Sequence, residues 1–358
     1  MQTKGAVFFL AANSSKGFFS LFNELYPYDS GWKTYIIKGG PGTGKSGLMK
    51  KVAAKAEEKG YTVERIICSS DPDSLDAVII PEKNLCFADG TAPHTLDPKY
   101  PGAVEEIINL GEFWDSKPLY KNKEHIITVT DCNKALHKRS ANYVSAVSTA
   151  LNDSKKIISP YIMREKAENY ATRFVLRNCK CSDRKGSEKR RFLSGITPKG
   201  YVTLFDTASL LCERIYSVSD ENQCVAGEVI NALRRAAISN GIDVITCLNP
   251  LSPEDLPLHI IFPDEKIGFF TSDSIQKFKN ISDKNINAKR FISGDVLSNH
   301  KQRLNFNKKT AAELLNEAIK LLENAKQTHD KMESYYIDAM DFDKLNIYTD
   351  ELIKKLFK

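Results

Sequence analysis

The sequence contains no apolar run close to the ~20 residues that a membrane-spanning helix needs. We therefore expect no membrane association. The segment from Ala6 to Ala12, which follows Lys4, has the composition of a short signal peptide. Because the residues that follow it recur inside the chain, and a cleaved leader would not be duplicated there, we interpret this segment as part of the mature fold.

None of the eight cysteines forms a Cys-x-x-Cys pair. Cys179 and Cys181 form a single Cys-x-Cys with no second Cys or His pair nearby, so we expect no zinc site. Most of the other cysteines lie in apolar segments, which is typical of small buried residues. Free thiols in a chain of this size indicate a reducing cytoplasm, and this is the location we expect.

A strong excess of one charge is also missing, because 51 basic and 45 acidic residues give a net charge of +6. This balance permits an anionic ligand without indicating nucleic acid. One dense basic stretch runs from Arg184 to Arg191, with no aromatic residue between its charges. We interpret this stretch as a solvated linker and expect no nucleic-acid partner.

The chain does contain a long internal repeat, with a spacing of about 181 to 183 residues. The segment Lys16–Phe22 (KGFFSLF), for example, reappears as Lys199–Phe205 (KGYVTLF). Several such matches occur in the same order, which predicts two copies of one unit. We place the first domain at residues 1–182 and the second at residues 190–358, with the basic stretch between them.

Each copy is predicted to be an α/β unit of the P-loop NTPase type. In the first copy, an apolar strand at 35–38 leads through a glycine-rich loop into a helix whose Leu48, Val52 and Ala56 share one face. Gly60 ends this helix, and apolar strands follow at 63–68 and 85–88. The order of strand, helix and strand predicts a parallel sheet that is covered on both faces.

Each copy ends in a long helical segment. The first spans about 133–177 and is interrupted near Ser159-Pro160, and the second spans about 307–357. We expect each helical appendage to pack against the sheet of its own copy. The alternative is that these appendages, or the second domain, bind a protein partner.

The loop of the first copy carries a phosphate-binding motif, Gly-x4-Gly-Lys-Ser/Thr. Its glycines let backbone N–H groups turn toward a phosphate, and the following helix directs its partly positive end there. We expect Lys45 to contact the β- and γ-phosphates and Ser46 to bind Mg²⁺. The predicted nucleotide-binding residues are Gly39, Gly40, Pro41, Gly42, Thr43, Gly44, Lys45, Ser46 and Gly47.

A second magnesium ligand is expected at the end of a neighbouring strand. Asp89 follows the apolar segment Leu85–Ala88 and is our candidate, although an Asp-Gly pair also forms turns without any ligand. Asp131 is the competing candidate, because residues 126–130 before it resemble a strand.

Three carboxylates, Asp71, Asp73 and Asp76, follow the second predicted strand. Ligands of open α/β sheets bind beyond the carboxyl ends of strands, so Asp71 and Asp73 join Lys45 and Asp89 as catalytic candidates. The alternative is that this Ser-Asp-Pro-Asp segment only caps a turn. His94 is a further candidate for phosphate contact, or else it only hydrogen-bonds within its own loop.

The second copy lacks the whole set of phosphate-binding groups. We therefore expect it not to bind a nucleotide in the same way, and to serve a structural, regulatory or partner-binding role. The replacements are Asp220 for Gly39, Val225 for Gly44, Ala226 for Lys45, Gly227 for Ser46 and Thr271 for Asp89.

These motifs resemble an uncharacterised family of bacterial ATPases with tandem, duplicated P-loop domains. The resemblance covers nearly the whole chain, is strongest from Gly17 to Trp114, and implies ATP binding at Gly39–Ser46. Family members often keep a P-loop in both halves, and this chain does not. The segments that carry the resemblance are YIIK-GGPGTGKS at 35–46, residues 68–76, FADGTAPH at 87–94 and DPKYPGA at 97–103.

The sequence thus predicts an ATP- and Mg²⁺-binding P-loop NTPase, with hydrolysis as the expected activity and one working site per chain. The group that orients the attacking water is not assigned, since Gly90 follows Asp89 where many ATPases have Glu; Glu64, Asp71 and Asp73 are possible. An arginine finger, which would stabilise charge at the γ-phosphate, is not assigned either, although Arg164, Arg173 and Arg177 lie on the first appendage. Two alternatives stay open: a small-molecule kinase with Asp71 or Asp73 as base, and a nucleotide-gated switch that binds a partner.

Overall fold

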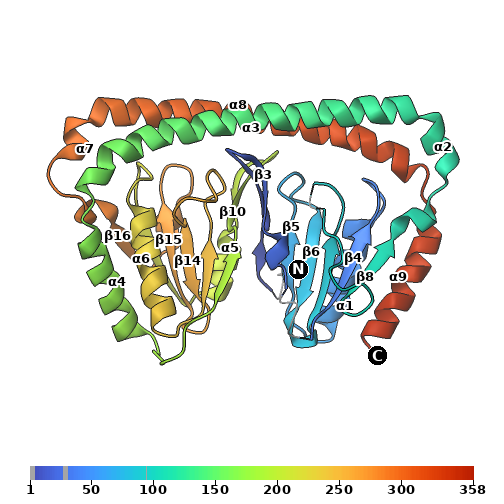
Figure 1. Cartoon of the computed structure of the whole chain (residues 1–358), viewed down its shortest axis with the longest axis horizontal. Coiled ribbons are helices and arrows are strands. Elements are labelled where there is room, and N and C mark those ends of the chain that lie inside the picture. Colours follow the sequence, from blue (N-terminus) through green and yellow to red (C-terminus); the bar gives the residue numbers. More distant parts are fainter. Residues whose placement is uncertain (1–4, 27–30, 94) are drawn as a thin grey trace.

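The computed structural model describes residues 5–26, 31–93 and 95–358. Two α/β units stand side by side beneath a pair of long helices that spans both of them (Figure 1). These helices are α3 (Lys123–Ile158) and α8 (Lys301–Ile337). Helix α3 belongs to the first copy of the repeat and α8 to the second, so the pair joins the two halves of the sequence.

The first unit is built on a six-stranded sheet with the order β1-β5-β6-β7-β4-β8. Strand β4 is parallel to both β7 and β8, and β1 is parallel to β5, whereas β6 is antiparallel to its two neighbours. The predicted α/β class is confirmed, and the sheet is mixed rather than purely parallel. The strands are β1 (Val7–Phe8), β4 (Lys33–Lys38), β5 (Glu64–Ile67), β6 (Leu75–Ile80), β7 (Leu85–Asp89) and β8 (Glu105–Asn109).

The second unit repeats this sheet strand for strand, in the order β9-β13-β14-β15-β12-β16. The register is repeated too: Ile37 pairs with Asp89 between β4 and β7, and Val218 pairs with Thr271 between β12 and β15. Thr271 therefore occupies the Asp89 position, as the sequence predicts. The strands are β9 (Glu188–Arg191), β12 (Arg214–Ser219), β13 (Val244–Cys247), β14 (His259–Phe262), β15 (Ile267–Ser272) and β16 (Lys284–Asn287).

One helix covers the equivalent face of each sheet. Helix α1 (Lys45–Glu58) buries Leu48, Val52 and Ala56, the face that the periodicity predicts. Helix α6 (Ala226–Ser239) is its counterpart in the second unit. Gly60, just beyond α1, has a φ of 89°, which confirms the left-handed position that was expected to end this helix.

The terminal helix of each copy packs on the unit of the other copy. Helix α4 (Arg164–Asn178) lies against α6 of the second unit, and α9 (Phe342–Leu356) lies against α1 of the first (Figure 1). The expectation that each appendage packs on its own sheet is therefore wrong. The long helices α3 and α8 are the reason, because each carries the chain from one end of the molecule to the other before the shorter helix begins.

The two units share a continuous junction. Two hairpins meet there, β2 (Ala11–Ser14) with β3 (Gly17–Ser20) and β10 (Ser194–Thr197) with β11 (Gly200–Thr203). Phe9 and Phe192 exchange backbone hydrogen bonds of 2.9 Å in both directions. Buried residues of both units form one cluster around this contact. The shared core makes the junction an integral part of the fold.

The basic stretch from Arg184 to Arg191 is not a solvated linker. Its second half forms edge strand β9, which pairs with β13. Arg191 is fully buried and donates from Nε to Glu64 at 2.7 Å, while Lys189 pairs with the other oxygen of the same carboxylate. Arg190 pairs with Glu24. These charges hold the two units together, which composition alone does not reveal.

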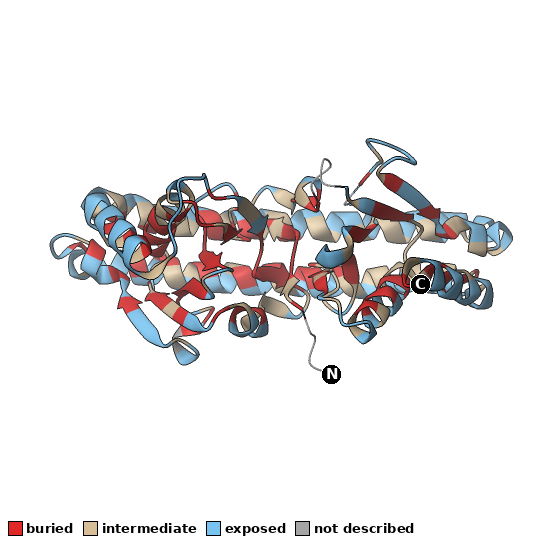
Figure 2. Ribbon diagram, turned by 90° about the horizontal axis from the view of Figure 1, so that it is seen from below, coloured by how far each residue is buried: buried red, intermediate tan, exposed pale blue. Residues whose placement is uncertain are grey.

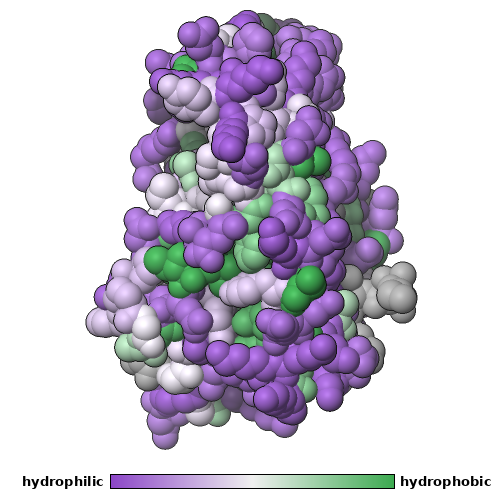
Figure 3. Space-filling view, turned by 90° about the vertical axis from the view of Figure 1, so that its right-hand side faces the viewer, coloured by the Kyte–Doolittle hydropathy of each residue, from purple (hydrophilic) through white to green (hydrophobic). Residues whose placement is uncertain are grey.

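Buried residues concentrate on the strands of both units, whereas the helices have one buried and one exposed side (Figure 2). The end of the molecule formed by α2 (Ser116–Lys121) and α9 is mostly hydrophilic, with small separate hydrophobic areas (Figure 3). Within the described ranges, no helix combines the length and the hydropathy required to cross a membrane.

Candidate functional site

The phosphate-binding motif forms the connection between β4 and α1, as its sequence predicts. We call residues Gly39–Ser46 the working loop. Gly42 and Gly44 have φ angles of 70° and 92°, a region that side chains disfavour. Helix α1 begins directly after Gly44 and has no side-chain cap on its first turn. An uncapped, glycine-led helix start of this kind is a favourable place for an anion.

Lys45 lies at the centre of this site. Its ammonium group donates to the carbonyl oxygens of Gly39 and Gly40, at 3.2 and 2.7 Å, which curl the loop around it. The same nitrogen is 3.6 Å from Oδ2 of Asp89 at the end of β7, and both side chains are largely shielded from solvent. The fold thus brings together the two residues that the sequence singled out for phosphate and magnesium.

Asp89 also forms the turn that follows it. Its Oδ1 accepts from the backbone N–H of Thr91 at 2.8 Å and from the Thr91 hydroxyl at 2.5 Å. The turn-forming interpretation and the site interpretation are therefore compatible, since one oxygen serves the turn and the other faces Lys45. Ser46, the second expected magnesium ligand, accepts at Oγ from the N–H of Leu75 at 2.9 Å, which ties the loop to β6.

The carboxylates after β5 separate in the structure. Asp71 accepts from the Ser74 hydroxyl at 2.8 Å and lies 3.7 Å from the ammonium of Lys326 on α8. Asp73 is exposed and pairs at 2.6 Å with Lys199 of the second unit. Asp76 is buried within β6. Asp71 remains near helix α8, whereas Asp73 makes its ion pair across the junction; a catalytic role for either stays a prediction.

Several other candidates lie away from the working loop. Glu64 begins β5, at the opposite end of the strand from the carboxyl edge, and is held by Arg191, so it is not available to orient water. Asp131 does not end a strand, because residues 126–130 belong to helix α3 and Asp131 pairs there with Lys134. His94 lies outside the described residues.

The arginines of the first appendage are also far from the working loop. They lie on α4, which packs on α6 of the second unit, at the end of the molecule opposite α1 (Figure 1). Arg164 is engaged with Glu228 of α6 at 3.0 Å. These arginines therefore do not reach the working loop of the same chain, and an arginine finger stays unassigned. The three residues concerned are Arg164, Arg173 and Arg177.

Residues near the carboxyl terminus cover the working loop, and the sequence motifs give no sign of this. A Cβ atom on Gly40 would lie 2.5 Å from the Tyr336 ring, and one on Gly44 would lie 2.8 Å from Leu345. The loop thus contacts the end of α8 and the start of α9. Glycine is needed at these positions partly to admit helices from the other half of the chain.

The equivalent loop of the second unit, Asp220–Gly227, is closed by its own carboxylate. We call it the second loop. Oδ2 of Asp220 accepts backbone hydrogen bonds from Cys224, Val225 and Ala226, at 2.8, 2.6 and 2.9 Å. These amides begin α6, so an internal anion occupies the place where the motif would hold phosphate. Because Asp220 already satisfies these amides, the second loop is stable without a bound phosphate.

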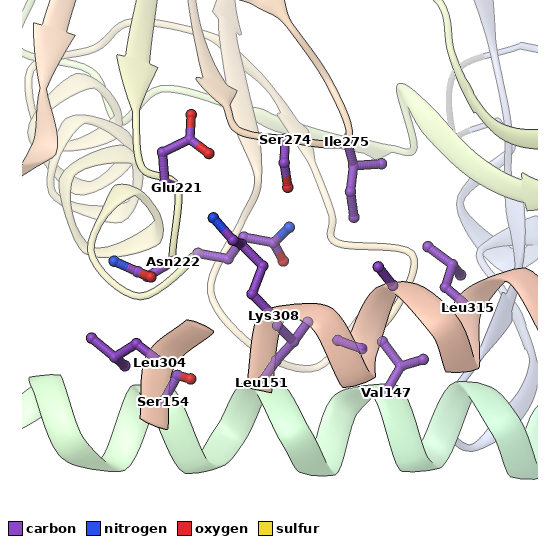
Figure 4. Close-up of a pocket in the computed structure, with 13 residues that line it drawn as sticks. Val147, Leu151, Ser154, Glu221, Asn222, Ser274, Ile275, Leu304, Lys308 and Leu315 are labelled. Carbon is purple, nitrogen blue, oxygen red and sulfur yellow. The ribbon is translucent and has the colours of Figure 1, made fainter. Parts of the chain in front are cut away.

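A small cavity separates the second loop from the long helices (Figure 4). Its volume of about 30 Å³ is room for one or two water molecules and far too small for a nucleotide. Lys308 extends from α8 toward the second loop beside it. The lining comes from α3 (Val147, Leu151, Ser154), the second loop (Glu221, Asn222, Gln223), the residues after β15 (Ser274, Ile275) and α8 (Leu304, Lys308, Ala311, Ala312, Leu315).

Comparisons of the chain with protein-family models, with curated proteins and with solved structures gave no match. Function is therefore inferred from the residues and their geometry.

Proposed function

We propose that this chain binds ATP with Mg²⁺ at the working loop and hydrolyses it, with one nucleotide per chain. The observation that carries the proposal is the meeting of Lys45 and Asp89, 3.6 Å apart, beside the uncapped start of α1. A cation, a carboxylate and backbone amides in one place are the groups that a magnesium-bound triphosphate requires.

Each residue has a defined part in this proposal. Lys45 leaves the Gly39 and Gly40 carbonyls to contact the β- and γ-phosphates, where its charge offsets the negative charge that builds up during transfer. Gly42 and Gly44 allow the backbone amides to face the phosphates.

Mg²⁺ fits the oxygen atoms that are present. The Ser46 hydroxyl and the Asp89 carboxylate are hard oxygen ligands, and Mg²⁺ in nucleotide sites needs only one or two carboxylates because phosphates and water complete its shell. The described residues contain no group of three His, Cys, Asp or Glu side chains that could hold a metal by themselves. Nucleotide-bound Mg²⁺ does not require such a group. When bound, the ion supplies charge neutralisation at the phosphates.

A nucleotide-gated switch is a second candidate function. The observation that favours it is the contact of α8 with the working loop, since a ligand there acts directly on a helix that also contacts the second unit. In this case hydrolysis is slow, and nucleotide binding changes the affinity for a protein partner at the second unit or the long helices.

Lys45→Ala should weaken Mg-ATP binding by about 10- to 100-fold, because a charge-assisted contact to phosphate contributes roughly 1.5–3 kcal/mol. Calorimetric titration of the wild type should give one nucleotide per chain. Lys55→Ala is the matched control, because Lys55 lies on the same helix and pairs with Glu58 one turn away.

Phosphate release from Mg-ATP, with and without a panel of small hydroxyl-bearing metabolites, separates hydrolysis from phosphoryl transfer. Binding without release supports the switch. If wild type and Lys45→Ala bind Mg-ATP equally, the proposed site is wrong. Two nucleotides per chain would contradict the inactive second loop.

A further inference from the structure

Helix α8 places a carboxylate on the working loop. The Glu333 carboxyl lies near the backbone N–H of Gly42, which helps to lower the pKa of that carboxyl. The approach is close, because a Cβ atom on Gly42 would lie 3.0 Å from the Glu333 carbonyl oxygen and 3.1 Å from its Cβ. Gly42 is thus one of the points at which α8 meets the loop, and a side chain there would press against the helix.

Two further charged contacts involve this part of α8. His329, one turn earlier, lies with Nε2 3.3 Å from Oε1 of Glu333, and this contact keeps the pKa of the carboxyl below its usual value. Lys326, another turn back, lies 3.7 Å from Asp71 in the first unit. The segment 326–333 therefore presents an ionised carboxylate to the loop and is tied to the same unit by a second contact.

The position of Glu333 conflicts with that of a bound phosphate. Backbone amides of a P-loop cradle phosphate oxygens, and here a residue with a carboxylate already lies against the loop at Gly42. Two anions cannot share one amide without strong repulsion in a partly buried site. Glu333 must therefore move before a triphosphate can use the Gly42 amide.

The second loop also has a carboxylate close to its backbone amides, but this carboxylate cannot be displaced as a separate element. There the stand-in anion is Asp220, which belongs to the loop itself and satisfies three amides at once. In the working loop the anion comes from a separate element and is therefore replaceable. Its side chain is 29% exposed, so it can rotate toward solvent.

The helix position opposite the second loop carries the reverse charge. The backbone hydrogen bonds Met163–Phe291 and Asp341–Phe113 are equivalent in the repeat, and Lys155 precedes Met163 by as many residues as Glu333 precedes Asp341. Lys155 pairs with Asp255 at 3.0 Å and acts electrostatically on Cys224 of the second loop. A carboxylate faces the loop that lacks an internal anion, and a lysine faces the loop that has one.

We propose that Glu333 is a displaceable stand-in for phosphate, so that nucleotide binding at the working loop releases the end of α8 and the start of α9. This inference rests on the proposed function. Helix α8 packs on α3 along the molecule, and its Ala311 and Leu315 belong to the core between the long helices and the second unit. Release at one end of α8 therefore changes a helix that contacts both units.

The test compares Glu333→Gln with Glu323→Gln, the same substitution at an exposed position of the same helix. Two quantities are measured on the full chain: calorimetric affinity for Mg-ATP, and amide hydrogen exchange of residues 326–345 without nucleotide. Glu333→Gln should bind Mg-ATP about 10-fold more tightly, since a competing charged contact is removed. It should also exchange faster in 326–345, and Mg-ATP should produce the same faster exchange in the wild type.

The outcomes separate the two proposals. If wild type binds Mg-ATP but the two variants share its affinity and exchange, Glu333 is not a stand-in and only this inference is overturned. If no chain binds Mg-ATP, the proposed function fails, and displacement by nucleotide fails with it. Unchanged urea midpoints for both variants establish that the fold is intact.

Discussion

Glu64→Gln should lower the free energy of unfolding by about 3–5 kcal/mol, because it leaves the buried guanidinium of Arg191 without its counterion. Arg191 is fully buried, and its Nε donates to Glu64 at 2.7 Å. Its Nη1 also donates to the carbonyl oxygen of Arg190 at 2.8 Å. Glutamine keeps the shape of the side chain and removes its charge, so the loss is electrostatic.

Glu24→Gln is the matched control for this prediction. Glu24 pairs with Arg190 of the same strand β9 and across the same junction, but the Arg190 side chain is 46% exposed. Such pairs contribute about 0–1 kcal/mol, so the control should stay close to wild type. Urea unfolding followed by far-UV circular dichroism measures both. Equal midpoints for the two variants would show that the junction does not depend on the buried pair.

The same ion pair should make the stability depend on pH. Arg191 and Lys189 lower the pKa of Glu64 to about 2, against the value of 4.5 for a free side chain, despite the opposing effect of its burial. A carboxyl whose folded-state pKa is depressed adds stability that is complete above pH 4.5 and is lost as the pH falls toward 2. The difference in urea midpoint between wild type and Glu64→Gln should therefore shrink over this interval. A constant difference would contradict the depressed pKa.

Leu352→Ala should destabilise the protein by about 2–5 kcal/mol, although Leu352 lies only six residues from the carboxyl terminus. On helix α9 it is buried in the cluster that includes Leu48 and Val52 of α1. Truncation leaves a cavity in the core of the first unit, so hydrogen exchange should rise in α1 rather than in α6.

Ile347→Ala provides the control on the same helix, because Ile347 is 62% exposed and should change the stability by less than about 1 kcal/mol. Chemical denaturation gives the free energies, and hydrogen exchange locates the effect. If Leu352→Ala loosened the second unit and left α1 protected, the crossed packing of the terminal helices would be wrong.

Local patterns predicted much of each unit. Strands β4 and β7 and helix α1 follow from apolar periodicity and from the motif between them, since these depend on residues close in sequence. Strand β6 was missed as a separate strand, although its segment is apolar. It is buried along its whole length, and a short apolar run without alternation does not predict whether the segment is a strand or a helix, or in which direction a strand runs.

Some residues of the predicted site were placed correctly and others were not, again because local patterns do not determine long-range contacts. Lys45 was found from its motif and Asp89 from its place at the end of an apolar strand, and the carboxyl edge of the sheet brings the two together. Glu64 was misplaced because it begins its strand, far from the carboxyl edge, and Asp131 because its segment forms a helix rather than a strand. Glu333 carries no motif, and only packing brings it to Gly42.

The sequence alone determined the duplication, the α/β class of each copy, and the contrast between a glycine-rich loop with Lys45 and a loop with Asp220. These properties depend on residues that are close together in the sequence and on the repetition of their pattern. The tertiary structure decided that each terminal helix packs on the other copy and that α8 covers the working loop. Such contacts join residues up to about 300 positions apart, and their choice depends on the length of the paired helices and on the fit of their buried faces.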